Sequence, residues 1–267
     1  MPTNLISAKK FWKTKASNYP LPFDPDTFKK TKRIIRRIKK ENIIFKNKNI
    51  IDIGCGTGIY TLPFALEAAE VTGTDFSLLM LKKMKEEAKN QKIKNLKTIY
   101  SSWEDFDFKK HRKNYDIAFA SMTAAIKTAS AVKKMETVAT DYCIVVSWAG
   151  KRKNAFMREI YKNFGIKDKA PDFIGTISKI LKKRDVKYKK VLIEDSWSFK
   201  GTAKEAAIQA LPHLQINGVK ISLDKLEKII AEKFGTREIH HTTFAGKGIV
   251  IWKPPLINFK NQITNPK

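Results

Sequence analysis

Glycines and aspartates at fixed spacing form the most informative segment of the chain. The sequence IDIGCGTG at residues 51–58 follows a short apolar run and precedes a helix-like segment at 60–69. Glycines in such a loop let the backbone turn sharply and let a ligand lie against it without a Cβ in the way. Asp75 ends the next apolar run, 23 residues after Asp52, where a carboxylate can accept hydrogen bonds from ribose hydroxyls. The spacing therefore predicts a site for a ribose-containing ligand.

This loop differs from the dinucleotide fingerprint G-x-G-x-x-G. The third glycine, Gly58, comes one position early, and an aspartate stands two residues before Gly54. We therefore reject that fingerprint as the explanation of the loop.

Cysteines and histidines add little further chemistry. Two cysteines exclude a disulfide scaffold and a four-thiolate metal site within one chain, and we predict no metal site. We interpret Cys55 as a small residue of the loop rather than a nucleophile, and Cys143 as a core residue. His240 and His241 are adjacent on the last expected strand, so one points toward each face of the sheet.

Strand and helix patterns alternate around the loop. The expected strands lie at 49–53, 71–74, 97–101, 115–120 and 142–147, and the expected helices at 28–42, 60–69, 77–89 and 123–139. Such alternation indicates βαβ units. We therefore predict an α/β fold with a doubly wound, parallel sheet and helices on both faces.

The regular alternation of strands and helices ends after Gly150. Helices are expected at 154–164, 172–184, 202–214 and 222–234, and strands at 188–199 and 238–252, the last with a break at its internal glycines. Ser77 and Ser222 are predicted N-caps, and Thr202 with Glu205 predicts a capping box.

The length of 267 residues fits one α/β domain with insertions, or at most two small domains. Residues 1–19 carry lysines but no continuous apolar core of a signal peptide, and no stretch reaches the roughly 18–20 apolar residues of a membrane span. We therefore expect a soluble, cytoplasmic protein. The sequence leaves its oligomeric state open.

At its motifs the chain resembles the class I S-adenosylmethionine-dependent methyltransferases, in particular the small-molecule enzymes of the ubiquinone and menaquinone biosynthesis type (methyltransferase type 11/25 domain). The matching stretches are IIDIGCGTG, VTGTDFS, YSSWEDF and YDIAFASMTAA, within residues 45–150. The opening AKKFWKTKASNYP resembles a helix placed over the cofactor, and GIVIWKP resembles the last, antiparallel strand. The resemblance implies a Rossmann-like, seven-stranded, mostly parallel sheet with a helical lid insertion.

The resemblance also implies where S-adenosylmethionine binds, to leave as S-adenosylhomocysteine. The glycine loop would carry its methionine part, with Asp52 serving the loop or the cofactor's ammonium group. Asp75 would hold the ribose, and Phe76 would cover one face of the adenine. The implied cofactor-binding residues are Asp52, Gly54, Cys55, Gly56, Thr57, Gly58, Asp75, Phe76, Ser102, Trp103, Glu104, Ala120, Ser121 and Met122.

Residues 102–104 and 120–122 of this set follow or end the third and fourth expected strands. Ser102 stands where the family often has an acidic residue, so recognition of the adenine amine falls to the backbone or to Glu104. Trp103 would lie at the adenine edge, or it packs in the core. The residues at 120–122 end the fourth strand and would face the transferable methyl group.

By this resemblance the chain has four parts. Residues 1–44 would be N-terminal helices capping the cofactor site, 45–150 the cofactor-binding core, 151–255 the rest of the sheet with helical substrate-lid insertions, and 256–267 a tail. Candidates for the acceptor pocket are Trp12, Tyr19, Trp148, Trp197 and His241, each of which has packing as its alternative.

The expected reaction is transfer of a methyl group to a small-molecule acceptor by direct displacement. A general base is needed only where the nucleophile carries a proton at the reactive atom, and the sequence singles out none. Methylation of a protein, and a cofactor-binding protein without activity, stay open as alternatives.

RNA is the main alternative acceptor because the formal charge is +27. Lysine supplies 45 of the 53 cations, so compositional bias also explains the charge. The fourth strand lacks the Asn/Asp-Pro-Pro-Tyr/Phe signature of enzymes that methylate base amines, and the chain has no Pro-Cys dipeptide. The cations of the expected basic helix are Lys29, Lys30, Lys32, Arg33, Arg36, Arg37, Lys39 and Lys40.

Overall fold

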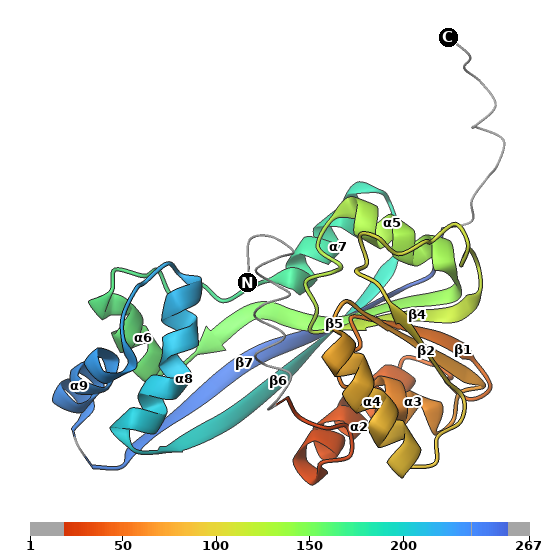
Figure 1. The fold of residues 1–267 in the computed structure, drawn as a ribbon. Coiled ribbons are helices and arrows are strands. Elements are labelled where there is room, and N and C mark those ends of the chain that lie inside the picture. Colours follow the sequence, from red (N-terminus) through yellow and green to blue (C-terminus); the bar gives the residue numbers. More distant parts are fainter. Residues whose placement is uncertain (1–18, 236, 256–267) are drawn as a thin grey trace. The chain divides into compact units, whose positions relative to one another are not determined.

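The fold is built on one seven-stranded sheet. The computed structural model describes residues 19–235 and 237–255, and Figure 1 labels their elements. The strands are β1 (Asn49–Ile53), β2 (Glu70–Asp75), β3 (Leu96–Tyr100), β4 (Tyr115–Ser121), β5 (Ala139–Lys153), β6 (Tyr188–Gly201) and β7 (Ile239–Trp252). Their order across the sheet is β3-β2-β1-β4-β5-β7-β6. Six strands are parallel and the last is antiparallel, as the resemblance implied.

The chain divides into two compact units, and β5, β6 and β7 run from one into the other. The described part of unit 1 consists of Val146–Thr176 and Val191–Ile249. Unit 2 holds the described residues of Lys13–Val145, Ile177–Lys190 and Val250–Lys267. Each unit has a core of its own.

Strand register brings the carboxyl ends of β2, β1 and β4 to one edge of unit 2. Ile53 at the end of β1 pairs with Thr74 on one side and with Ala120 on the other. The strand order changes direction between β1 and β4, and open α/β sheets bind ligands outside such a point.

The helices of unit 2 follow the apolar pattern of the sequence. They are α2 (Pro25–Lys39), α3 (Thr61–Ala65), α4 (Leu78–Asn90), α5 (Ala129–Val138) and most of α7 (Phe173–Lys183). In α2 the side chains of Ile34, Ile35 and Ile38 are buried, because they recur at helical spacing on one face. Ser77 caps α4 by accepting a hydrogen bond from the backbone of Met80, as predicted.

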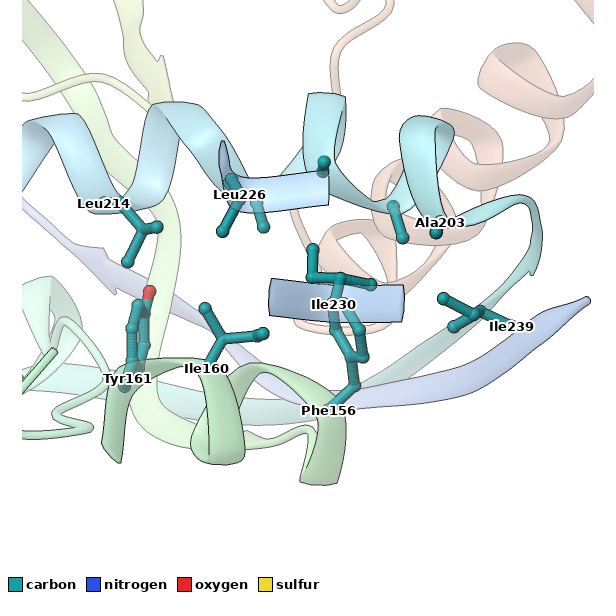
Figure 2. Close-up of a cluster of buried hydrophobic side chains, with 11 residues drawn as sticks. Phe156, Ile160, Tyr161, Ala203, Leu214, Leu226, Ile230 and Ile239 are labelled. Atoms are coloured by element: carbon teal, nitrogen blue, oxygen red, sulfur yellow. The ribbon is translucent and has the colours of Figure 1, made fainter. Parts of the chain in front are cut away.

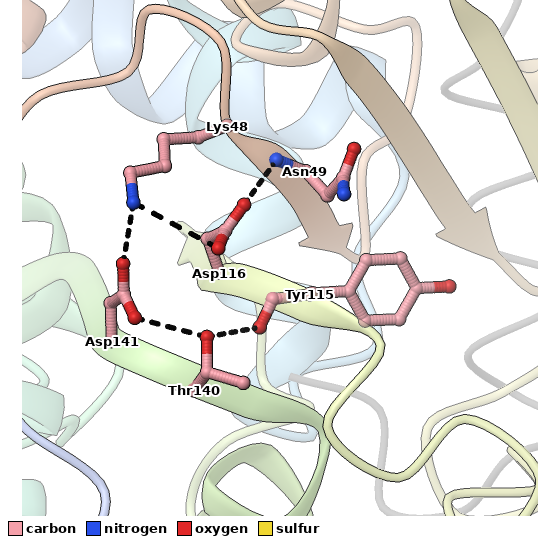
Figure 3. A network of polar contacts seen from close by, with 6 residues as sticks. All are labelled: Lys48, Asn49, Tyr115, Asp116, Thr140 and Asp141. Carbon is pink, nitrogen blue, oxygen red and sulfur yellow. Dashed lines mark hydrogen bonds and ion pairs between the residues drawn. The ribbon is translucent and has the colours of Figure 1, made fainter.

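The amino edge of the same sheet is closed by an ion-paired network (Figure 3). Lys48 Nζ lies 2.7 Å from Asp141 Oδ2 and 3.8 Å from Asp116 Oδ1. The other oxygen of Asp116 accepts a 2.7 Å hydrogen bond from the backbone of Asn49. Thr140 donates to Asp141. The network therefore joins the first residues of β1, β4 and β5.

Unit 1 has a separate core around an alanine-rich helix (Figure 2). Its helices are α6 (Ala155–Asn163), α8 (Ala203–Ile216) and α9 (Leu223–Phe234). Small side chains on α8, such as Ala206, Ala207 and Ala210, let larger residues such as Ile160 and Ile230 pack closely against it. The predicted capping box of Thr202 with Glu205 and the Ser222 cap are confirmed.

Two local predictions were wrong. The glycines at 246 and 248 do not break β7, which is continuous to Trp252. A Cβ at either glycine would lie 3.0 Å from Lys151 or Ile174, so these glycines permit close packing across the strand. The helix expected from residue 123 begins only at Ala129, because Thr128 caps it there.

Candidate functional site

The glycine loop is fixed to the neighbouring strand by its backbone. The backbone amides of Gly54 and Cys55 both donate to the carbonyl of Thr74, at 2.8 and 3.1 Å. Gly54, Gly56 and Gly58 all have positive φ, from 56° to 87°. This backbone conformation therefore favours glycine at all three positions, because residues with a Cβ rarely adopt it.

The surroundings of these glycines differ in a way that locates open space. A Cβ added at Gly54 would lie 2.6 Å from Thr123 Oγ1, and one at Gly58 would lie 2.6 Å from Met84 Cγ. At Gly56 the nearest atom is Tyr19 Cε1, at 3.9 Å. As far as the described residues show, the loop is thus packed by the protein at its two ends and open at its middle glycine.

Asp75 lies beside this opening and is held by backbone amides. Its two carboxylate oxygens accept hydrogen bonds from Gly56 N at 3.0 Å and from Ser77 N at 2.8 Å. Burial raises the pKa of Asp75, and the hydrogen bonds from the backbone oppose that shift. Each oxygen keeps lone-pair capacity for a further donor such as a ribose hydroxyl.

Asp52 lies beneath the loop rather than at its surface. Its side chain is 2% exposed and accepts a 2.6 Å hydrogen bond from Thr61 Oγ1. Burial raises the pKa of Asp52 to about 7, and the charge of Asp75 adds to this shift. Of the two roles expected for Asp52, this geometry favours support of the loop. Sequence reasoning missed Thr61, because only the fold turns it toward Asp52.

The segment after β4 packs against the glycine loop. Ala120 is fully buried, and Met122 has a left-handed backbone with φ of 51°. Within the described part of the chain, the buried Ser121 Oγ has no hydrogen-bond partner. Thr123 contacts Gly54, as described above, and no sequence signal identified it.

Residues 102–104 follow β3 and have partners of their own. Ser102 Oγ lies 2.6 Å from Asp105 Oδ2, to which it donates. The Trp103 ring stacks on Phe106, and its indole N–H donates to the carbonyl of Ala131 at 3.1 Å. Glu104 is exposed. The Trp103 side chain is thus a packing residue, which leaves its backbone and Glu104 for contact with a ligand.

Three further candidates adjoin the loop. Thr57 Oγ1 donates to the carbonyl of Pro20 at 2.7 Å, so the segment before α2 lies against the loop. Phe76 follows Asp75 directly and is partly exposed. Burial raises the pKa of Tyr19, and the charge of Asp75 adds to this shift. Cys55 is buried and its pKa is raised well above the usual value, chiefly by burial, which does not suit a nucleophile.

The remaining pocket candidates lie in unit 1. The rings of Trp148 and Trp197 are tilted by 43° with their centroids 6.3 Å apart, and Trp197 is 41% exposed. Lys247 Nζ lies 5.5 Å from the centre of the Trp148 ring and 2.6 Å from Asp195 Oδ2. This group combines aromatic faces with an ion pair.

His241 is also in unit 1, enclosed by aromatic rings. It stacks on Phe156 at 4.5 Å and on Phe199 at 5.0 Å, and its Nδ1 lies 3.2 Å from Asn154 Nδ2. Burial lowers the pKa of His241, and the adjacent His240 lowers it further. His241 is therefore a partly buried residue that packs against Phe156 and Phe199. Trp12 lies outside the described residues.

In residues 19–235 and 237–255, no three His, Cys, Asp or Glu side chains gather as a metal site would require. No helix in that part of the chain is long and apolar enough to span a bilayer.

Comparisons with solved structures identify the fold. The YcgJ protein of Bacillus subtilis is 14% identical, with a TM-score of 0.54 over 82% of this chain and 97% of that one. A putative methyltransferase of Bacillus halodurans is 13% identical, with a TM-score of 0.56 over 82% and 98%. At these identities the likeness concerns the fold alone.

Curated relatives match a shorter part of the chain. A 23S rRNA (uracil(1939)-C(5))-methyltransferase of Francisella tularensis is 31% identical over 39% of this chain. The ribosomal RNA small subunit methyltransferase G of Clostridium perfringens is 37% identical over 37% of it. The matches span only 25% and 38% of those two proteins.

A sequence profile described as a methyltransferase domain matches residues 44–194, which is more than half of the chain. The matched range contains the glycine loop, Asp75 and the segment after β4. The cofactor of the class I methyltransferases is S-adenosylmethionine. The chain belongs to the methyltransferase domain family and has the class I fold.

Proposed function

We propose that this protein transfers a methyl group from S-adenosylmethionine to a small-molecule acceptor. The observation that carries the proposal is the open middle of the glycine loop: among the described residues, a Cβ at Gly56 would meet only Tyr19, and the Gly56 amide donates to Asp75. A ligand with a ribose and a chain that passes over the loop fits such a cradle.

The residues present suit this cofactor. Asp75 would hold the ribose hydroxyls, and Phe76 would cover the adenine. The backbone at 102–103 and the side chain of Glu104 would contact the adenine edge. The methionine part of the cofactor would lie over the loop at Gly54, Gly56 and Gly58. Asp52 supports the loop from below and contributes negative charge near a cationic ligand.

The bound cofactor supplies an activated methyl group on a sulfonium. The protein then has to align the acceptor with that group and exclude water, and positioning can provide most of the acceleration. The short segment at 120–122 ends β4 at the carboxyl edge, where we place the acceptor's reactive atom. Its buried Ser121 hydroxyl is free to donate a hydrogen bond.

A small acceptor is favoured by the chemistry of unit 1. Trp148 and Trp197 offer apolar, planar walls next to the ion pair of Lys247 with Asp195. Such a combination suits a planar organic molecule with a polar group. We also propose that α8 and α9, inserted between β6 and β7, act as a lid that selects the acceptor. The described residues before α2 would cap the cofactor.

RNA is the second candidate acceptor. Both kinds of curated relative named above are ribosomal RNA methyltransferases, but they match only 39% and 37% of this chain. That similarity supports the methyl donor more than the acceptor.

The experiment has two stages. Binding of S-adenosylmethionine is measured by calorimetry for the wild type, Gly56→Arg and Asp75→Ala, with Lys85→Ala as a surface control. We expect both site variants to lose binding, because one fills the open cradle and the other removes the ribose acceptor. Unchanged binding in both would contradict the proposed site.

The second stage identifies the acceptor. Methyl-labelled S-adenosylmethionine is added with the enzyme to an extract of the source cells, which is then separated into low-mass, RNA and protein fractions. Label in the low-mass fraction that depends on Asp75 supports the proposal. Label that nuclease removes would assign the activity to RNA instead.

A further inference from the structure

More than half of the net charge comes from two short segments of unit 2. Residues 29–48 contain ten Lys or Arg and one acidic residue, and residues 177–190 contain seven and one. These 34 residues therefore contribute +15 of the total charge of +27. A bias toward lysine that acted evenly along the chain does not produce this concentration.

The fold brings the two segments together. Glu41, directly after α2, lies 3.3 Å from Arg37 Nη2 and 3.5 Å from Lys189 Nζ near the start of β6. The end of α7 is fixed by Arg184, which forms two hydrogen bonds with the buried Glu136 at 3.0 and 2.6 Å. The only two acidic residues of the segments are Glu41 and Asp185. Cations from both segments thus share one surface, which we call the basic surface.

In the described part of the chain, most exposed cations of the basic surface have no acidic partner. Eleven of them form no ion pair there, namely Lys29, Lys30, Lys32, Arg36, Lys40, Lys46, Lys179, Lys182, Lys183, Lys187 and Lys190. Repulsion among so many unpaired cations disfavours the folded state, so their concentration calls for an anionic partner.

We propose that the basic surface binds RNA through its phosphate backbone. A helix of 15 residues such as α2 is about 22 Å long, so its cations can follow several successive phosphates. The segment at 177–190 extends this row beyond the end of α2. Contacts of this kind position a nucleic acid without reading its sequence.

A membrane fits the surface less well. Helices that bind in the plane of a bilayer bury an apolar face in it. The apolar face of α2 is already used by the protein, since Ile34, Ile35 and Ile38 are at most 7% exposed. The helix therefore offers charge to the solvent without an apolar face to insert.

The location separates this inference from the proposed function. Glu41 joins the end of α2 to the start of β6 in the basic surface, whereas the glycine loop contacts the segment that precedes α2. The surface would dock RNA whether or not RNA is the methyl acceptor.

The test compares two variants with the same change in charge. The first reverses four cations of the basic surface: Lys29→Glu, Arg36→Glu, Lys183→Glu and Lys187→Glu. The matched control reverses four exposed lysines elsewhere in unit 2: Lys85→Glu, Lys89→Glu, Lys94→Glu and Lys109→Glu. The probe is a fluorescent RNA duplex of about 16–20 base pairs, followed by anisotropy.

We expect the wild type to bind the duplex with an affinity that falls steeply between about 50 and 200 mM salt. The surface variant should lose about tenfold or more in affinity. Its negative slope of log affinity against log salt should become shallower by about 3, because fewer phosphates are contacted. The control should lose about threefold or less, because charges more than about 10 Å from the RNA are screened.

Three results would overturn the inference. Equal losses in both variants would mean that binding follows net charge alone, and no loss in either would mean that the surface is not used. Binding to vesicles that contain phosphatidylserine, without binding to the duplex, would assign the surface to membranes. Thermal unfolding and S-adenosylmethionine binding of the same preparations show that each variant is folded, and they report on the cofactor site separately from the basic surface.

Discussion

The two edges of the sheet in unit 2 use polar residues in opposite ways. At the amino edge, Lys48 is joined to both Asp116 and Asp141, and the aspartates also bind the neighbouring backbone or hydroxyl groups. At the carboxyl edge, two acidic residues have raised pKa values chiefly because they are buried, and the described residues include no Lys or Arg ion pair to either.

The polar residues of the amino edge therefore stabilise the fold, whereas those of the carboxyl edge are available to a ligand. The two carboxylates at the amino edge share one lysine of the protein, and this network holds three strand ends together. The carboxyl edge instead keeps negative charge, open space at Gly56 and three left-handed glycines. Such an edge is suited to complete its interactions with a cationic ligand, which S-adenosylmethionine is.

The largest expected effect is a difference in the free energy of unfolding between alanine substitutions at two glycines of one loop. Gly58→Ala places a Cβ 2.6 Å from Met84 in a left-handed conformation, so we expect a loss of about 2–4 kcal/mol in the free energy of unfolding. Gly56→Ala has only the conformational cost of about 1–2 kcal/mol. Denaturant unfolding measures both, and equal costs would contradict the packing difference.

Gly56→Ala should nevertheless impair cofactor binding more than its stability cost suggests, because its Cβ points into the open cradle. Calorimetry at a temperature where the variant is fully folded tests this. Wild-type affinity in Gly56→Ala would place the ligand elsewhere.

The second prediction concerns the pH dependence of the carboxyl edge. The pKa of Asp52 is about 7 in the folded protein, above its unfolded value of about 3.9. Between these values the folded state holds a proton that the unfolded state has lost, so the free energy of unfolding should fall as pH rises from about 4 to 7. Affinity for the cationic cofactor should rise as Asp52 ionises.

Asp52→Asn provides the control for this effect. The amide can still accept the hydrogen bond from Thr61 but does not titrate. Unfolding curves and calorimetric titrations at pH 5, 6, 7 and 8 should show a weaker pH dependence than in the wild type. An unchanged profile would assign the titration to another group.

A third, smaller effect tests the amino edge. Lys48→Met removes the partner of two aspartates, and we expect a loss of about 1 kcal/mol, since the lysine is one-third exposed and its pairs are screened. Hydrogen bonds from Lys48 and Thr140 lower the pKa of Asp141 despite its burial. In the variant that pKa should rise, which NMR titration measures.

Lys97→Met is the matched control, since Lys97 pairs with Glu70 at 2.8 Å but is 67% exposed. It should change stability less than Lys48→Met does. Neither variant should alter cofactor affinity, and a loss of affinity in Lys48→Met would show that the two edges are not independent.

The smallest effect is expected at Tyr19. Tyr19→Phe removes a hydroxyl near Asp75 but keeps the ring beside Gly56, so cofactor affinity should fall by about two- to tenfold, the value of one neutral hydrogen bond. Calorimetry measures this change, and Tyr19→Ala should cost more because it also removes the ring. A loss as large as that of Asp75→Ala would give Tyr19 a larger role.

Local chemistry explains which parts of the fold were predictable. The loop at 51–58, the Ser77 cap and the Thr202–Glu205 capping box depend on residues close in sequence, and the structure confirms their expected conformations. The prediction of a break at the glycines of β7 was wrong. These glycines permit close packing against Lys151 and Ile174, which are distant in sequence. The roles of the site residues in binding stay predictions.

The sequence by itself determined the βαβ order, the glycine loop and the acidic residue that ends the second strand, because these depend on periodicity and backbone conformation over a few residues. Only the tertiary structure decided that Thr61 bonds Asp52, that Thr123 packs on Gly54, and that His241 lies between two phenylalanine rings. It also decided that Lys189 meets Glu41, 148 residues away in sequence. Such contacts are set by strand order and packing, which join residues that no local pattern relates.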